Sequence, residues 1–158
     1  MDQKARIQNV VDRIRKHHFR VGAANVDKIN RLQVKLGGRL PADFVEFYSE
    51  VDGAWLFRGK DPPFRLMSVS EMEKVDEGYF PESEDNERLL VFCYCQDSNY
   101  VGVRCFDDEP ERVEIVDCWH EAYPEFGSDY TIGTSFIEFV EGLLDSEGRE
   151  FWLGRKRQ

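Results

Sequence analysis

The chain has 158 residues, a formal net charge of −10, 41% hydrophobic residues and 13% aromatic residues. This length fits one domain, which can bury a core without disulfides or metals. The sequence lacks an apolar run of the roughly 18 residues that indicate a membrane-spanning helix. Its charged N-terminus also lacks the apolar segment of a secretory signal. We therefore expect a cytoplasmic protein with no membrane partner.

The charges are unevenly distributed along the chain. Residues 1–40 carry ten Lys or Arg and three Asp or Glu. Residues 41–154 carry eight Lys or Arg and twenty-eight Asp or Glu. Such an acidic body repels nucleic acid and attracts basic proteins. We interpret the basic segment as helices that fold back on the acidic body. Contact between these helices and nucleic-acid phosphates is the alternative.

Three helices are predicted in the first third of the chain, where apolar residues recur at helical spacing. They cover residues 3–19, residues 26–36 and a segment that begins at Pro41. Pro41 suits the first helical position because the N–H that it lacks would have no helical partner there. The third helix has one apolar face over residues 44–51 and ends at a turn formed by residues 52–53.

The next part of the chain changes its hydrophobic period. Residues 64–69 predict a short strand. Residues 68–75 predict a short helix with Ser70 as its N-cap and Glu73 three residues later. The acidic segment 76–88 has Gly, Pro and little periodicity, so it predicts an exposed loop.

The second half predicts a run of strands. The continuous apolar run 89–95 is typical of a central strand. Residues 100–106 are its expected hairpin partner across the turn 96–99. The remaining predicted elements are an acidic turn at 107–111, a half-buried strand at 112–119, a loop-rich segment at 120–133 and a helix with a capping box of Ser135 and Glu138.

Helices at both ends of the chain enclose these strands, which predicts an α+β fold with one sheet. We divide the chain into a basic helical extension (1–25), an α+β domain (26–146) and a C-terminal tail (147–158). Within the tail, Phe151 and Trp152 are expected to dock back on the body.

Four residues could hold a metal ion if the fold brings them together. Cys93 and Cys95 face the same side of a strand, and Cys118 and His120 have the same spacing, so the four converge if the strands are neighbours. Structural zinc sites, however, usually place their ligand pairs on turns. Free cysteines are also often simply buried. We expect these cysteines to be buried and the protein to need no metal or other cofactor.

The sequence shows no motif that indicates catalysis. It has neither a GxSxG elbow nor an HExxH helix. The segment "GGRLP" at 37–41 matches neither the P-loop nor the dinucleotide-binding pattern. The sequence therefore predicts that the protein is not an enzyme.

Protein binding is the best-supported physical option. Two acidic segments can steer a basic partner and raise its association rate, although acidic loops can also serve solubility alone. Their candidate partner-binding residues are Glu82, Glu84, Asp85, Glu87, Asp107, Asp108, Glu109 and Glu111. Further candidates are Asp52, Trp55, Asp97 and Trp119. These four fall near one end of the sheet if the turns at 52–53 and 96–99 are neighbours. Burial of the two tryptophans in the core is the alternative.

Several segments, in order, resemble the SUKH superfamily in its Smi/Knr branch, named after fungal cell-wall-assembly regulators. They include "VKLGGRLPADFVEFYSEVDGAW" (34–55), "LLVFCYCQDSNYVGVRCF" (89–106) and "IGTSFIEFVEGLL" (132–144). The resemblance covers residues 26–144. The chain departs from the family pattern at residues 52–53, where Asp-Gly replaces the usual Asn-Gly. It departs again in "CYCQDSN", which replaces the usual Gly-x-(Asp/Asn).

The resemblance implies an α+β fold whose mixed, mostly antiparallel sheet packs against helices, and it implies no catalysis. Bacterial members resemble immunity proteins, which bind and block a cognate toxin that is often a nuclease. Our hypothesis is an immunity protein that neutralises a basic, nuclease-type toxin through its acidic surface. A regulatory or scaffold module that binds host signalling or cell-wall-related proteins is the alternative. The sequence leaves the oligomeric state open.

Overall fold

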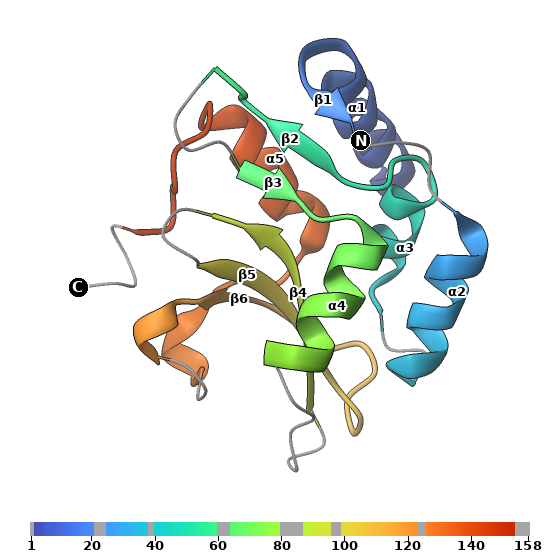
Figure 1. The fold of residues 1–158 in the computed structure, drawn as a ribbon, viewed down its shortest axis with the longest axis vertical. Helices are drawn as coiled ribbons and strands as arrows, with labels where there is room; N and C mark the ends of the chain where they lie inside the picture. Colours follow the sequence, from blue (N-terminus) through green and yellow to red (C-terminus); the bar gives the residue numbers. More distant parts are fainter. Residues whose placement is uncertain are drawn as a thin grey trace.

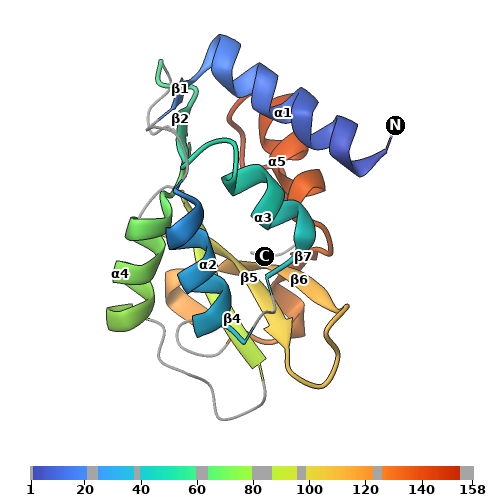
Figure 2. The same cartoon turned by 90° about the vertical axis from the view of Figure 1, so that its right-hand side faces the viewer.

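The computed structural model describes residues 2–20, 25–37, 40–59, 64–79, 87–95, 99–122 and 126–153. Within them the chain forms a seven-stranded sheet whose strands follow one another in sequence order, with helices packed against it (Figures 1 and 2). Every pairing between described strands is antiparallel. The predicted α+β fold is confirmed.

The described helices are α1 (Gln3–His17), α2 (Val26–Lys35), α3 (Ala42–Tyr48), α4 (Val69–Tyr79) and α5 (Phe136–Asp145). The strands are β1 (Phe19–Arg20), β2 (Ala54–Leu56), β3 (Phe64–Leu66), β4 (Glu87–Tyr94), β5 (Tyr100–Phe106), β6 (Val113–Cys118) and β7 (Thr131–Gly133). Two short 3-10 helices, η2 (His120–Ala122) and η3 (Ser128–Tyr130), lie between β6 and β7. Among the described helices, none has the length and apolar character that crossing a membrane requires.

The core contains a cluster of aromatic rings from α3, α5 and β4. The Phe44 ring of α3 lies 4.9 Å from the Phe136 ring of α5, measured between centroids. Phe136 in turn lies 5.1 Å from Phe92 on β4. Phe47 and Tyr48 are fully buried beside them, and the Tyr48 hydroxyl donates to the Met67 carbonyl at 2.8 Å. The helical spacing of the α3 aromatics therefore predicted the core face correctly.

Helix α1 packs on this core and carries its basic residues to acidic partners. Its apolar face, which includes Ile7, Val10 and Ile14, is buried. The ion pairs of its polar face join Arg6 to Glu138 and Glu141, Arg13 to Asp145, and Arg15 to Glu50. Exposed pairs of this kind contribute little stability, so the buried apolar face supplies most of the attachment. The interpretation that the basic segment folds back on the acidic body is confirmed for α1.

The C-terminal segment also docks on the core, as predicted. Trp152 is 1% exposed, and its ring lies 5.4 Å from Phe139 and 6.1 Å from Phe64. Residues from both ends of the chain therefore bury side chains against residues 26–146. The division into the three parts 1–25, 26–146 and 147–158 stays a prediction.

The start and length of α4 differ from the sequence prediction. The N-terminal capping residue is Ser68, because its hydroxyl accepts the Glu71 N–H at 3.2 Å. The Ser68 N–H in turn donates to the Glu71 carboxylate at 3.5 Å. The prediction of Ser70 as N-cap is therefore wrong by two residues. The helix also continues to Tyr79, so the first part of segment 76–88 is helical rather than a loop.

The turn before β2 depends on a glycine. Gly53 has a φ of +88°, a conformation that costs glycine little and other residues more. A Cβ atom placed there would lie 2.6 Å from the Leu66 carbonyl oxygen. The turn therefore needs both the backbone freedom and the small size of glycine.

We predict that Gly53→Ala lowers the free energy of unfolding by at least about 2 kcal/mol, because it adds backbone strain and a collision with a fixed carbonyl. Urea denaturation measures this change. Gly59→Ala is the matched control, since a Cβ atom there meets no atom within 4 Å. Equal losses in the two variants would show that the close approach at Gly53 is unimportant.

A histidine joins α1 to the edge of the sheet. The His18 Nδ1 accepts the Phe57 N–H at 3.1 Å, and the two rings pack edge to face with centroids 4.6 Å apart. Burial lowers the pKa of His18, and the nearby His17 and Arg13 lower it further. Phe57 itself has a φ of +57°. The neutral imidazole thus holds a strained residue at the end of β2.

We predict that the folded protein loses stability as the pH falls. The pKa of His18 is lower in the folded chain, so the unfolded chain binds the extra proton once the pH falls below the ordinary value of about 6.5. The stabilisation is complete above that value and is lost as the pH falls through the folded pKa. Urea titrations at several pH values should show this slope, with a smaller slope in His18→Asn. His17→Asn removes only a lesser cause of the lowered His18 pKa and should keep most of the slope. An unchanged slope in His18→Asn would refute the assignment.

Candidate functional site

The pairing of β4 with β5 brings Glu87 and the acidic turn 107–111 to one end of the sheet. Glu87, the first residue of β4, is the register partner of Phe106, the last residue of β5. The turn 107–111 therefore begins beside Glu87 at the start of β4 (Figure 2). We call Glu87 and residues 107–111 the acidic end. Glu82, Glu84 and Asp85 lie outside the described residues.

The side chains of the acidic end differ in their surroundings. Asp108, Glu109 and Glu111 are exposed, and Asp107 is half-buried. Glu109 pairs with Arg112 at 3.3 Å. In the part of the chain that the structure describes, Asp108 and Glu111 make no ion pair. The acidic end therefore presents negative charge to solvent.

A buried arginine ties the acidic end to the neighbouring strands. Arg104 on β5 is 7% exposed. Its Nε donates to Glu114 on β6 at 3.0 Å, and it also donates to the Phe126 carbonyl and to the Thr131 hydroxyl. The Glu87 carboxylate lies 3.7 Å from its Nε. Arg104 thus has hydrogen-bond acceptors on β6, on β7 and in the segment before β7, and a longer ion pair with Glu87 on β4.

Glu114 is the carboxylate at the centre of this network. Burial alone would raise the pKa of Glu114, but hydrogen bonds and charges from Arg112 and Arg104 outweigh burial and lower it. The second arginine, Arg112, contacts Glu114 at 3.1 Å and also covers the Phe106 ring at 3.9 Å. The carboxylate stays ionised, and the turn between β5 and β6 is held in place.

A second feature lies at the other ends of β4 and β5 and extends across the neighbouring strands β3 and β2. Trp55, Arg65, Tyr94 and Tyr100 are successive register partners on β2, β3, β4 and β5. The Arg65 guanidinium lies 5.0 Å from the Trp55 ring and 5.2 Å from the Tyr94 ring. The Tyr94 and Tyr100 rings are 5.4 Å apart. All four side chains are half-buried. We call them the aromatic–arginine row.

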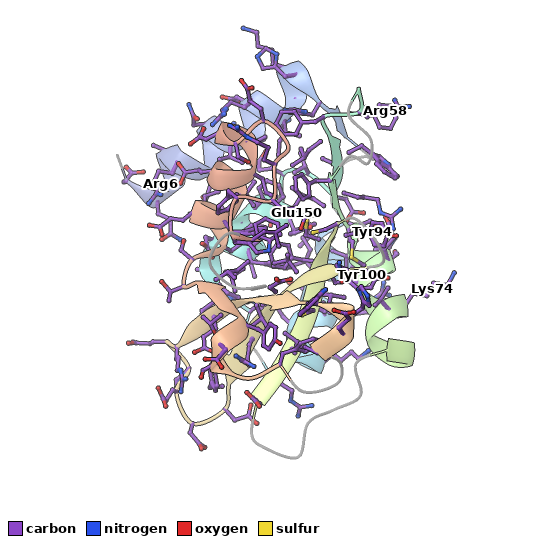
Figure 3. The ribbon with its side chains drawn as sticks, turned by 90° about the vertical axis from the view of Figure 1, so that its left-hand side faces the viewer. Arg6, Arg58, Lys74, Tyr94, Tyr100 and Glu150 are labelled. Carbon is purple, nitrogen blue, oxygen red and sulfur yellow. The ribbon has the colours of Figure 1, made fainter. Side chains whose placement is uncertain are left out.

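The row lies on the sheet face away from α5. Register partners in antiparallel strands point to the same side, and Figure 3 shows Tyr94 and Tyr100 on the side of the sheet opposite α5. Arg65 also pairs with Glu71 on α4 at 2.9 Å. Trp55 was predicted from its residue type, whereas Arg65, Tyr94 and Tyr100 were not. The predicted hairpin contained part of the signal, because Tyr94 and Tyr100 stand close to either side of its turn.

Trp119 directly follows the strand next to this row, and Asp52 does not belong to the row. Trp119 follows Cys118, the register partner of Tyr100, and it is half-buried. The buried Asn99 accepts the His120 N–H at 2.8 Å and so ties the end of β6 to the turn after β4. Asp97 lies outside the described residues.

Asp52 instead serves the scaffold. Its carboxylate accepts the Val69 N–H at 2.9 Å, at the first residue of α4. A Cβ atom on the neighbouring Gly53 would meet Met67 and Ser68. The turn at 52–53 therefore lies beside the start of α4. Residues 96–98 lie outside the described residues, so the expectation that the turns at 52–53 and 96–99 are neighbours stays a prediction. A partner contact at Asp52 stays a prediction.

The four soft ligands considered for a metal do not converge. Cys93 is the register partner of Val101, which pairs with Asp117, whereas Cys118 pairs with Tyr100, so Cys93 and Cys118 point to opposite faces. Burial raises the pKa of the Cys95 and Cys118 thiols. Within the described ranges, no three His, Cys, Asp or Glu side chains form a metal-binding group.

The fold and these two features define a small α+β domain that presents an acidic surface and an aromatic surface. The chain belongs to the SMI1 / KNR4 family (SUKH-1), whose family model matches residues 23–142. The resemblance inferred from the sequence is confirmed over nearly the same range.

One curated relative is informative. The chain is 24% identical over 119 residues to a protein of Bacillus subtilis (strain 168) named "Immunity protein YokJ", and the alignment covers 73% of this chain and 71% of the relative. No solved structure matches the chain significantly.

We predict that Arg104→Met lowers the free energy of unfolding by about 2–3 kcal/mol, because it removes the buried donor to Glu114, to the Phe126 carbonyl and to Thr131. Arg112→Met is the matched control, since Arg112 binds the same carboxylate from an exposed position and should matter much less. Thermal and urea denaturation measure both variants. Similar losses in the two variants would contradict the role given to burial.

Proposed function

We propose that this protein is a non-enzymatic immunity protein that neutralises a cognate toxin by binding it directly in the cytoplasm. Membership of the SMI1 / KNR4 family and the similarity to an immunity protein over about seven-tenths of both chains support this proposal. The net charge of −10 supports a basic partner.

The proposed contact surface is the acidic end. The observation that carries this proposal is the register of Glu87 with Phe106, which brings Glu87 to the start of the acidic turn 107–111. Glu82, Glu84 and Asp85 precede Glu87 in the sequence, and we include them in the surface.

The proposed toxin is a nuclease. A protein that binds nucleic acid presents Lys and Arg to the phosphates, so an acidic surface is complementary to the substrate-binding face of a nuclease. Binding there would block the substrate without any chemical step. The Arg104–Glu114 network supports this mechanism because it holds the acidic turn in place before the partner arrives.

We predict that Asp108→Lys/Glu109→Lys slows association with the toxin about tenfold or more at low salt, because opposite charges steer the encounter. The binding partner in the experiment is the C-terminal domain of the protein encoded directly upstream, and stopped-flow or surface measurements give the rates. Rescue of bacteria that express this toxin domain provides the functional readout.

The control is Asp12→Lys/Asp27→Lys, which changes the net charge equally at exposed positions on α1 and α2. This variant should associate at nearly the unmodified rate. Equal association rates in the two variants would refute the acidic-end mechanism. Binding of host signalling or cell-wall-related proteins, without rescue from a toxin, would favour the regulatory or scaffold function instead.

A further inference from the structure

We propose that the aromatic–arginine row anchors the same basic toxin that the acidic end attracts. In this inference the row determines how slowly the complex dissociates, and the acidic end determines how fast it forms. The inference rests on the proposed function and adds a second contact surface, with a different physical role, to it.

The composition and geometry of the row suit an anchor. Trp, Tyr and Arg are the residues most enriched at energetic hot spots of protein interfaces. Here Trp55, Arg65, Tyr94 and Tyr100 come from four neighbouring strands of one sheet. Their rings and guanidinium are already stacked on one another, so they would lose little side-chain freedom on binding.

The charges around the row favour a basic protein partner. The pair with Glu71 neutralises Arg65, so the row itself has no net charge. Glu87 and the exposed residues Asp108, Glu109 and Glu111 lie at the other end of the same pair of strands. An uncharged aromatic patch on the sheet that carries the acidic end complements a basic partner that also presents an apolar contact.

The two surfaces are close enough for one partner. Tyr94 and Glu87 are the two ends of β4, which places them about 23 Å apart at the usual rise per strand residue. A typical interface buries about 800 Å² on each partner, a patch wide enough to reach both. A toxin domain steered to the acidic end can therefore also contact the row.

The same features disfavour single-stranded nucleic acid on the row. Nucleobases stack on free aromatic faces inside a positively charged groove. In the row, Arg65 lies over the Trp55 and Tyr94 rings, and the Tyr94 and Tyr100 rings meet at 72°. The charge of Arg65 is also paired with Glu71.

The test separates the two rates. Trp55→Ala and Tyr94→Ala should each raise the dissociation rate of the toxin-domain complex by about 10- to 100-fold, while the association rate stays within about twofold of the unmodified protein. Val34→Ala is the control, because it removes apolar atoms from a side chain that is 81% exposed on α2, outside the row, and it should leave both rates unchanged. Thermal melts establish that each variant is folded. If Tyr94→Ala does not fold, Tyr94→Leu replaces it in the test, because leucine keeps an apolar side chain.

The outcomes distinguish this inference from the proposed function. Absence of any toxin binding by the unmodified protein would refute the proposed function and this inference with it. Toxin binding that row variants leave unchanged would refute the inference alone. Loss of self-association or of oligonucleotide binding in the row variants, with toxin dissociation unchanged, would identify a second copy or a nucleic acid as the occupant and would also overturn it.

Discussion

The pairing of β4 with β5 is the constraint on which both candidate surfaces depend. Its register places Glu87 beside Phe106 at one end and Tyr94 beside Tyr100 at the other. Because side chains alternate along a strand, a shift by one residue would turn every ring of the hairpin toward the opposite face. Gly102 allows the close approach in the middle, since a Cβ atom there would lie 2.9 Å from the Leu90 carbonyl.

Features set by local sequence could be predicted. The apolar spacing in α1, α3 and α5 depends on residues three and four apart, so those helices and their core faces followed from the pattern. The start of α4 did not follow, because Ser68 with Glu71 and Ser70 with Glu73 have the same spacing. Asp52, sixteen or more residues away in sequence, favours the first pair by accepting the Val69 N–H. The two- and three-residue strands β1 and β7 are too short to show a period.

The candidate site was less predictable than the fold because its residues meet through strand register. Acidic composition alone indicated both acidic segments, but not that Glu87 and the turn after Phe106 share one end of the sheet. Trp55 was singled out for its residue type. Its neighbours in the row were missed, since pairing with Arg65 and Tyr94 crosses loops whose lengths do not fix register. The sequence did not distinguish Arg104 from other basic residues in strands, because its burial is visible only in the structure.

The attachment of α1 gives the molecule an electric polarity. Its arginines are occupied by Glu50, Glu138, Glu141 and Asp145, so positive and negative charges largely cancel at that end. The acidic end lies at the far end of the long axis (Figure 1). At physiological ionic strength, this uneven charge acts on another protein that comes within about 8 Å of the surface. A positively charged protein at that distance is attracted to the acidic end. The two molecules therefore turn so that the acidic end faces the positive charge before they touch.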